Sequence, residues 1–180
     1  MLVVQATPKL RTRVSHEAAD DDVSSTTVLG DWYATVLFWR PQVALFVNTT
    51  SRLPVYVPFS PSADLFDRAP DAIAETLLRL GMEPAAVADE RAAMSDVRLR
   101  TVEDPEVDDV LQTWDAIASI WGRGRELPDL GVYLARASLD TPRRAIDVAG
   151  LHITTLPGPA ELDGPLAEVI PFPRRDPRAR

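Results

Sequence analysis

Residues 32–57 read WYATVLFWRPQVALFVNTTSRLPVYV, three apolar runs separated by two short polar segments. The first run is rich in aromatic and β-branched side chains, which favour strands. Arg-Pro-Gln at 40–42 and Asn-Thr-Thr-Ser at 48–51 are typical of turns. Two close turns between three such runs predict an antiparallel meander. Its strands are expected at residues 32–39, 43–47 and 53–57.

Downstream of this meander, apolar side chains recur at helical spacing. One stripe runs from Leu65 to Leu80, with a helix start predicted at Ser60 and Pro61 and a kink or break at Pro70. The clearest helix follows Asp104-Pro105. Other helices are predicted at 8–14, 84–94, 127–139 and 142–149, and other strands at 2–6, 97–102 and 151–156. We therefore expect an α+β fold with an antiparallel sheet of three to five strands packed by several helices.

The domain organisation follows from length and composition. A chain of 180 residues is typical of one domain. Periodicity is lost after Pro157, so we expect a single domain at 1–157. Residues 158–180 are rich in Pro, Gly and Arg, and prolines exclude regular helix near their end. This segment is predicted to be an extended or disordered tail.

Several kinds of chemistry are excluded by composition. The chain has no cysteine, which removes disulfides, Cys-based zinc sites, iron–sulfur clusters and thiol nucleophiles. Lys9 is the only lysine, so no Schiff-base or phosphate-binding lysine exists beyond it. We expect no cofactor and no bound metal. The first ten residues do not resemble a signal peptide, and no apolar run approaches the roughly 20 residues that span a bilayer. A cytoplasmic protein without membrane contact is expected.

The charge is distributed unevenly. Residues 1–60 carry five basic and five acidic side chains, whereas residues 61–121 carry five basic and fourteen acidic ones, a net charge of −9. Residues 122–180 have a net charge of +1. An acidic surface repels nucleic-acid phosphates. We therefore expect the partner to be another protein or a second copy of this chain, and nucleic acid is disfavoured.

Three segments carry a family resemblance: Thr7-Pro8-Lys9-Leu10, Leu29-Gly30-Asp31-Trp32-Tyr33-Ala34 and Leu53-Pro54-Val55. Together they resemble an uncharacterised bacterial domain family of unknown function. The likeness covers residues 1–95 and extends weakly to residues 140–142. It implies an α+β fold and a bacterial or mobile-element origin, and it implies no reaction. The chain departs from the family pattern at residues 97–103, which lack a Ser/Arg-rich segment.

The block around Asp31 is the most specific local feature. Asp31 can cap the turn before a strand by accepting backbone hydrogen bonds. Trp32 and Tyr33 are adjacent in the predicted strand and must point to opposite faces, one toward the core and one partly exposed. The block is therefore interpreted as a fold-defining turn, and alternatively as a binding site formed by Asp31 and the exposed aromatic residue.

Other charged clusters have a structural and a functional interpretation. Acids at the start of the clearest helix, among them Glu106 and Asp109, complement the helix dipole and alternatively form an acidic docking face. The adjacent acids at 20–22 lack the spacing of a calcium loop and are read as a solvated loop. Arg174 and Arg175 belong to a solvated tail, or to a strap that binds an acidic surface.

No catalytic set is assembled in the sequence. His16 and His152 are the only histidines and the only candidate general bases of that type. The leading hypothesis is a bacterial accessory protein, associated with mobile elements, that acts as a non-enzymatic interaction module through its acidic helical face or its tail. The alternative is a carboxylate-dependent hydrolase centred on Asp31. A third hypothesis is nucleic-acid binding through the arginine tail.

Overall fold

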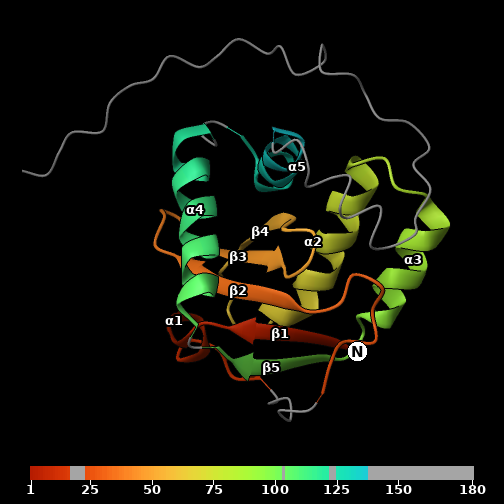
Figure 1. Ribbon diagram of the computed structural model, residues 1–180, viewed down its shortest axis with the longest axis horizontal. Coiled ribbons are helices and arrows are strands. Elements are labelled where there is room, and N and C mark those ends of the chain that lie inside the picture. The colour runs from red at the N-terminus through yellow and green to blue at the C-terminus, as the bar shows by residue number, and fades with distance from the viewer. Residues whose placement is uncertain (17–22, 103, 122–124, 138–180) are drawn as a thin grey trace, which may run out of the picture.

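The computed structural model describes residues 1–16, 23–102, 104–121 and 125–137. Within them, the chain forms a five-stranded sheet of order β4-β3-β2-β1-β5 and five helices (Figure 1). The strands are β1 (Leu2–Ala6), β2 (Trp32–Leu37), β3 (Val43–Asn48), β4 (Pro54–Pro58) and β5 (Val97–Thr101). The helices are α1 (Pro8–Arg11), α2 (Leu65–Arg79), α3 (Pro84–Ala93), α4 (Pro105–Trp121) and α5 (Leu127–Ala137). The α+β class is confirmed, while the elements predicted beyond residue 137 and the tail lie outside the described residues.

The predicted three-strand meander is confirmed. β2 and β3 are antiparallel, with Trp32 opposite Asn48, and β3 and β4 are antiparallel, with Val47 opposite Pro54. The side chain of Asn48 organises the second turn, because its Oδ1 accepts the backbone N–H of Ser51 at 2.8 Å. This is the local bonding for which Asn is favoured in turns.

The prediction of an antiparallel sheet is wrong for the other half of the sheet, which makes it mixed. β1 runs parallel to β2, with Val4 opposite Trp32, and parallel to β5, with Leu2 opposite Val97. Parallel neighbours need crossover connections, whereas a tight turn can join only antiparallel strands. The chain from β1 to β2 includes α1, and β5 follows only after α2 and α3. Turn residues in the sequence predict only the pairing of strands that a short turn joins, so they could not predict these parallel pairs.

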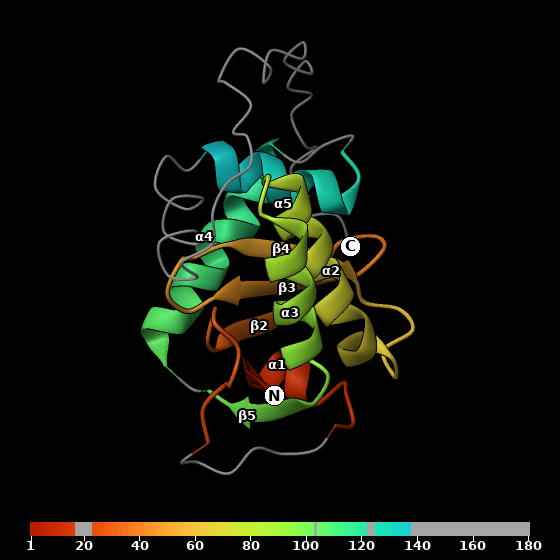
Figure 2. The same ribbon diagram turned by 90° about the vertical axis from the view of Figure 1, so that its right-hand side faces the viewer.

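Helices bury both faces of the sheet (Figures 1 and 2). On one face, α2 and α3 pack against the strands in a cluster that contains Trp32, Phe46 and Ile73. On the other face, α4 packs through Leu111 and Trp114. A sheet covered on both sides explains why five of the six β2 residues and all six β3 residues are buried.

α5 covers the β4 edge of the sheet and joins the two layers (Figure 1). Its Leu134 belongs to the cluster that contains α4, and its Ala135 belongs to the cluster that contains α2. Gly131 allows the close approach, since a Cβ atom at that position would lie 3.0 Å from the carbonyl oxygen of Pro54.

α2 differs from its prediction in two ways. It begins after Asp64 rather than after Ser60, and Pro70 lies inside it without dividing it. Proline removes one backbone hydrogen bond from a helix. Here the apolar stripe of the helix, Pro70 included, is buried, and this packing outweighs the local cost. No helix among the described residues is long and apolar enough to cross a membrane.

Candidate functional site

Two buried polar side chains hold the segment that leads into β2. Glu90 of α3 is 3% exposed and accepts the backbone N–H groups of Val28 at 2.8 Å and Leu29 at 3.0 Å. Asn48, fully buried at the end of β3, donates to the carbonyl oxygens of Leu29 at 2.8 Å and Asp31 at 3.3 Å. The turn before Trp32 is therefore fixed from two neighbouring elements.

Asp31 anchors the same segment. Its Oδ1 accepts the backbone N–H of Ser25 at 2.9 Å, and its Oδ2 accepts the side-chain amide of Gln5 at 3.1 Å. The predicted role in accepting backbone hydrogen bonds is confirmed, and the backbone donor lies six residues before Asp31. Because both oxygens are engaged by neutral donors, the geometry gives Asp31 a structural role.

Trp32 and Tyr33 point to opposite faces, as predicted. Trp32 is fully buried in the cluster with α2 and α3, and its indole N–H has no partner among the described residues. Tyr33 is half-buried on the α4 side, with the Arg52 guanidinium 5.8 Å from its ring centroid. Gln5, which contacts Asp31, lies opposite Tyr33 in the β1–β2 register. The structure thus brings Asp31 and Tyr33 to one face and assigns Trp32 to the core.

Glu106 and Asp109 lie exposed on the first turns of α4. Asp104 caps this helix, since its Oδ1 accepts the backbone N–H of Glu106 at 2.9 Å. Acids at a helix start complement its dipole, as the structural interpretation of the sequence predicts. α4 contains four acidic residues and no basic residue. The charged side chains on its outward face are therefore all acidic.

A small hollow of about 80 Å³ lies between α4 and the end of β2. Its walls include Asp108 and Asp115 of α4, Lys9 of α1, and Phe38. Phe38 is 58% exposed, and the guanidinium of Arg13 lies 4.9 Å from its ring centroid. The acidic face of α4 therefore borders an exposed aromatic side chain.

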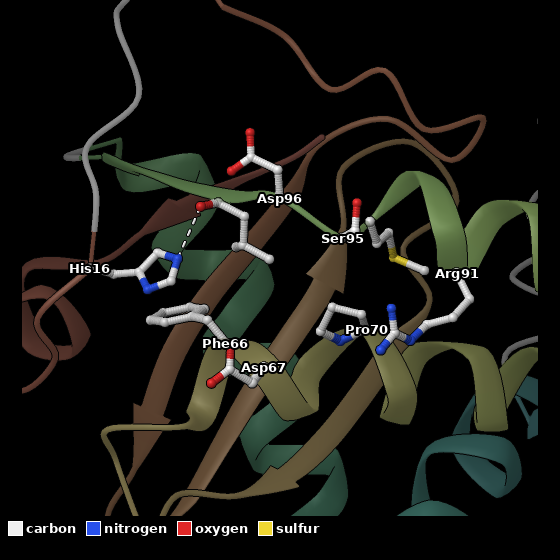
Figure 3. A pocket seen from close by; sticks show the side chains of 9 residues that line it. His16, Phe66, Asp67, Pro70, Arg91, Ser95 and Asp96 are labelled. Atoms are coloured by element: carbon white, nitrogen blue, oxygen red, sulfur yellow. Dashed lines mark hydrogen bonds between the residues drawn. The ribbon is translucent and has the colours of Figure 1, made fainter.

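A larger pocket of about 380 Å³ opens between α2, α3 and the start of β5 (Figure 3). His16 lies at one end, with its Nε2 2.9 Å from the carbonyl oxygen of Val97 and its ring centroid 4.8 Å from that of Phe66. Arg91 lies at the other end, and its Nε donates to Asp71 at 2.5 Å. A carbonyl can only accept a hydrogen bond, so His16 Nε2 carries a proton.

Tyr56 and Arg79 have displaced pKa values. Burial raises the pKa of Tyr56, and the negative charge of Asp115 raises it further. Its hydroxyl donates to the carbonyl oxygen of Trp114 at 3.2 Å. A hydrogen bond to Glu75 is the main cause that raises the pKa of Arg79. Neither group changes its charge at neutral pH.

Among the described residues, no group of three or more acidic or His side chains is placed to hold a metal ion. A family model described as a domain of unknown function, DUF6933, matches residues 3–113. The chain belongs to the DUF6933 family. No curated protein and no solved structure matches it. The DUF6933 match begins at the second residue of β1, contains the other four strands and the whole 380 Å³ pocket, and ends within α4.

Some predicted site residues of this DUF6933 chain cannot be placed. Arg174 and Arg175, His152 and the acids at 20–22 lie outside the described residues. Their suggested roles stay predictions. Glu106 and Asp109 lie on the face of the sheet that Tyr33 also occupies, while His16 lines the pocket beside α2 and α3.

Sequence reasoning missed Glu90 and the pocket in the DUF6933 domain. Glu90 lies three residues after Val87 and four before Met94, both buried, so the helical period already places it on the inner face of α3. The pocket left no such signal. Its residues come from the segment after α1, from α2 and from α3, which only the tertiary structure brings together.

Proposed function

We propose that this DUF6933 protein is a bacterial accessory protein of the cytoplasm that acts as a protein-interaction module. Its docking surface is the acidic outward face of α4, defined by Glu106, Asp108 and Asp109, and its partner presents a basic surface. The observation that carries the proposal is that these exposed carboxylates have no ion-pair partner among the described residues.

The contrast with α2 gives this observation its weight. Asp71 pairs with Arg91 at 2.5 Å, and Glu75 pairs with Arg79 at 2.6 Å. Asp64, just before α2, pairs with Arg68 at 3.0 Å. Neutralised carboxylates attract a basic partner less than free ones do, because the nearby guanidinium opposes them. Within α2 only Asp67 is left without an ion pair among the described residues, whereas Glu106, Asp108 and Asp109 of α4 all are.

The neighbouring hollow adds an apolar contact point. Phe38 is exposed to more than half of its area, and it lines the hollow beside Asp108. Aromatic side chains are enriched at protein interfaces, where charged residues at the rim steer association. An acidic helix beside an exposed aromatic ring supports a partner that carries both basic and apolar side chains.

The two alternatives have less support. The hydrolase hypothesis needs a free carboxylate at Asp31, whose two oxygens are engaged by Ser25 and Gln5. The nucleic-acid hypothesis depends on arginines beyond residue 170, while the acidic face of α4 repels phosphates. A second copy of this chain offers one such basic surface, the four arginines of its residues 171–180.

The test compares two double variants that remove the same charge. Glu106→Gln with Asp109→Asn neutralises the α4 face, and Asp89→Asn with Glu126→Gln neutralises two exposed acids elsewhere. Each immobilised protein is exposed to an extract of the source cells, and retained proteins are quantified by mass spectrometry. Exposed charge pairs contribute about 0.2–1 kcal/mol each, so a specific partner should bind the α4 variant roughly two- to thirtyfold more weakly.

The partner is then purified and its affinity measured against increasing salt. Binding to the wild type and to the control variant should weaken as salt rises, because exposed charges are screened. Equal recovery of the same proteins by the wild type and the α4 variant would contradict the proposal.

A further inference from the structure

The 380 Å³ pocket beside α2 and α3 is polarised along its length (Figure 3). Acceptors lie at one end. His16 donates through Nε2 to a backbone carbonyl, so its Nδ1 is an acceptor when the ring is neutral. The carboxylate of Asp67 is exposed at the same end. At the opposite end lie the donors Arg91 and Ser95.

Each end of the pocket has polar atoms that are available to a ligand. Arg91 uses Nε for Asp71, and its two terminal nitrogens have no partner among the described residues. Asp67 forms no ion pair within the described part of the chain. Asp96 also lines the pocket, but it pairs with Arg98 at 3.0 Å. One carboxylate without an ion-pair partner and the terminal N–H groups of one guanidinium, which is paired with Asp71 through Nε, therefore face the pocket.

The floor between these ends is apolar. Four lining side chains are buried: Phe66, Pro70, Met94 and Val97. Small-molecule sites have volumes of about 300–1,000 Å³, with a mostly apolar lining and a few polar groups that set orientation. The pocket's volume lies at the small end of this range, and its lining is more polar than that of such a site.

The spacing of the charges limits the ligand. Asp67 and Asp71 are four residues apart on α2, one helical turn or about 6 Å along the axis. Arg91 is bonded to Asp71, so its free nitrogens lie about one turn from Asp67. In a free α-amino acid one carbon separates the ammonium and carboxylate groups, which is too short for this spacing. In a dipeptide a full residue and a peptide bond separate them.

We propose that this pocket binds a small zwitterion of the dipeptide class. The ammonium group contacts Asp67 and His16 Nδ1, the carboxylate contacts Arg91, and apolar side chains lie on the floor formed by Phe66 and Met94. This site is separate from the α4 face and does not depend on the proposed interaction function.

The test is isothermal titration calorimetry on the full chain with L-alanyl-L-leucine. N-acetylation of the peptide removes its ammonium charge, and amidation removes its carboxylate. Hydrogen bonds to charged groups are strong enough that each modification should weaken binding roughly tenfold or more. Free leucine should also bind more weakly than the dipeptide.

Matched variants locate the two ends. Asp67→Asn should weaken binding of the dipeptide and leave binding of its N-acetyl form unchanged. Arg91→Gln should weaken binding of the dipeptide and leave binding of its amide unchanged. Asp89→Asn on α3 and the α4 variant of the previous section should bind like the wild type. No heat of binding at millimolar dipeptide overturns the proposal, as does wild-type affinity in Asp67→Asn. Thermal unfolding of each variant shows that it is folded, and the Asp67→Asn result decides the question if Arg91→Gln does not fold.

Discussion

Replacing Glu90 with Gln should destabilise the fold far more than an exposed charge change does. Both carboxylate oxygens accept backbone N–H groups, from Val28 at 2.8 Å and Leu29 at 3.0 Å. Gln keeps one acceptor oxygen and turns an NH₂ group toward the second N–H, so a donor faces a donor. An orphaned buried donor costs about 1–3 kcal/mol, and the loss of charge at the remaining bond adds about 1 kcal/mol. We expect a loss of about 2–4 kcal/mol in the free energy of unfolding.

Urea denaturation measures this loss, with the midpoint moving at constant slope. Asp89→Asn is the matched control, because it removes one negative charge from the neighbouring, exposed position of α3. Hydrogen exchange gives a second, local measurement: the amides of Val28 and Leu29 should exchange faster in Glu90→Gln. The reasoning would be refuted if the free energy of unfolding of Glu90→Gln lay within about 0.5 kcal/mol of the control, with both amides still protected. A difference of that size is typical of an ordinary surface substitution.

Three further changes test other parts of the fold. The pKa of Tyr56 is raised in the folded state. Its contribution to the free energy of unfolding is therefore complete below about pH 10 and falls by up to about 1.4 kcal/mol per pH unit above it. Tyr56→Phe should remove that alkaline slope in unfolding titrations, and an unchanged slope would contradict this assignment. Gly131→Ala should cost about 1–3 kcal/mol, since the new Cβ meets the Pro54 carbonyl oxygen at 3.0 Å; an unchanged melting temperature would argue against close packing of α5 on β4. Asn48→Ala should cost about 2–5 kcal/mol in urea, because it strips partners from several buried backbone groups, and a loss below 1 kcal/mol would show that water replaces them.

The parts of the fold that depend on neighbouring residues could be predicted from the sequence. Apolar runs and turn residues predict the meander, and helical periodicity predicts α2 to α5 within a few residues. The parallel pairings of β1 could not be predicted, because they join segments about 30 and 95 residues apart through crossovers. At Pro70 the local prediction is wrong, because proline favours a break in the helix but tertiary packing keeps α2 continuous.

The candidate site divides in the same way. The opposite orientations of Trp32 and Tyr33 follow from strand geometry alone and could be predicted. The partners of Asp31 could not, because Gln5 reaches it only when β1 pairs beside β2. The sequence shows His16 as one of only two histidines, in a polar segment, yet its place beside Phe66 depends on how the chain returns to β5.

The acidic excess of residues 61–121 has different consequences on different helices. On α2 the carboxylate of Glu75 is held by Arg79, which also contacts Asp129 from α5, 50 residues later. The four acids of α4 form no ion pair within the described part of the chain. The net charge of a sequence segment therefore overstates how strongly α2 attracts a basic partner. For α4, whose acids are unpaired, it does not. This difference in pairing, which only tertiary contacts create, is the reason to place the docking surface at Glu106 and Asp109.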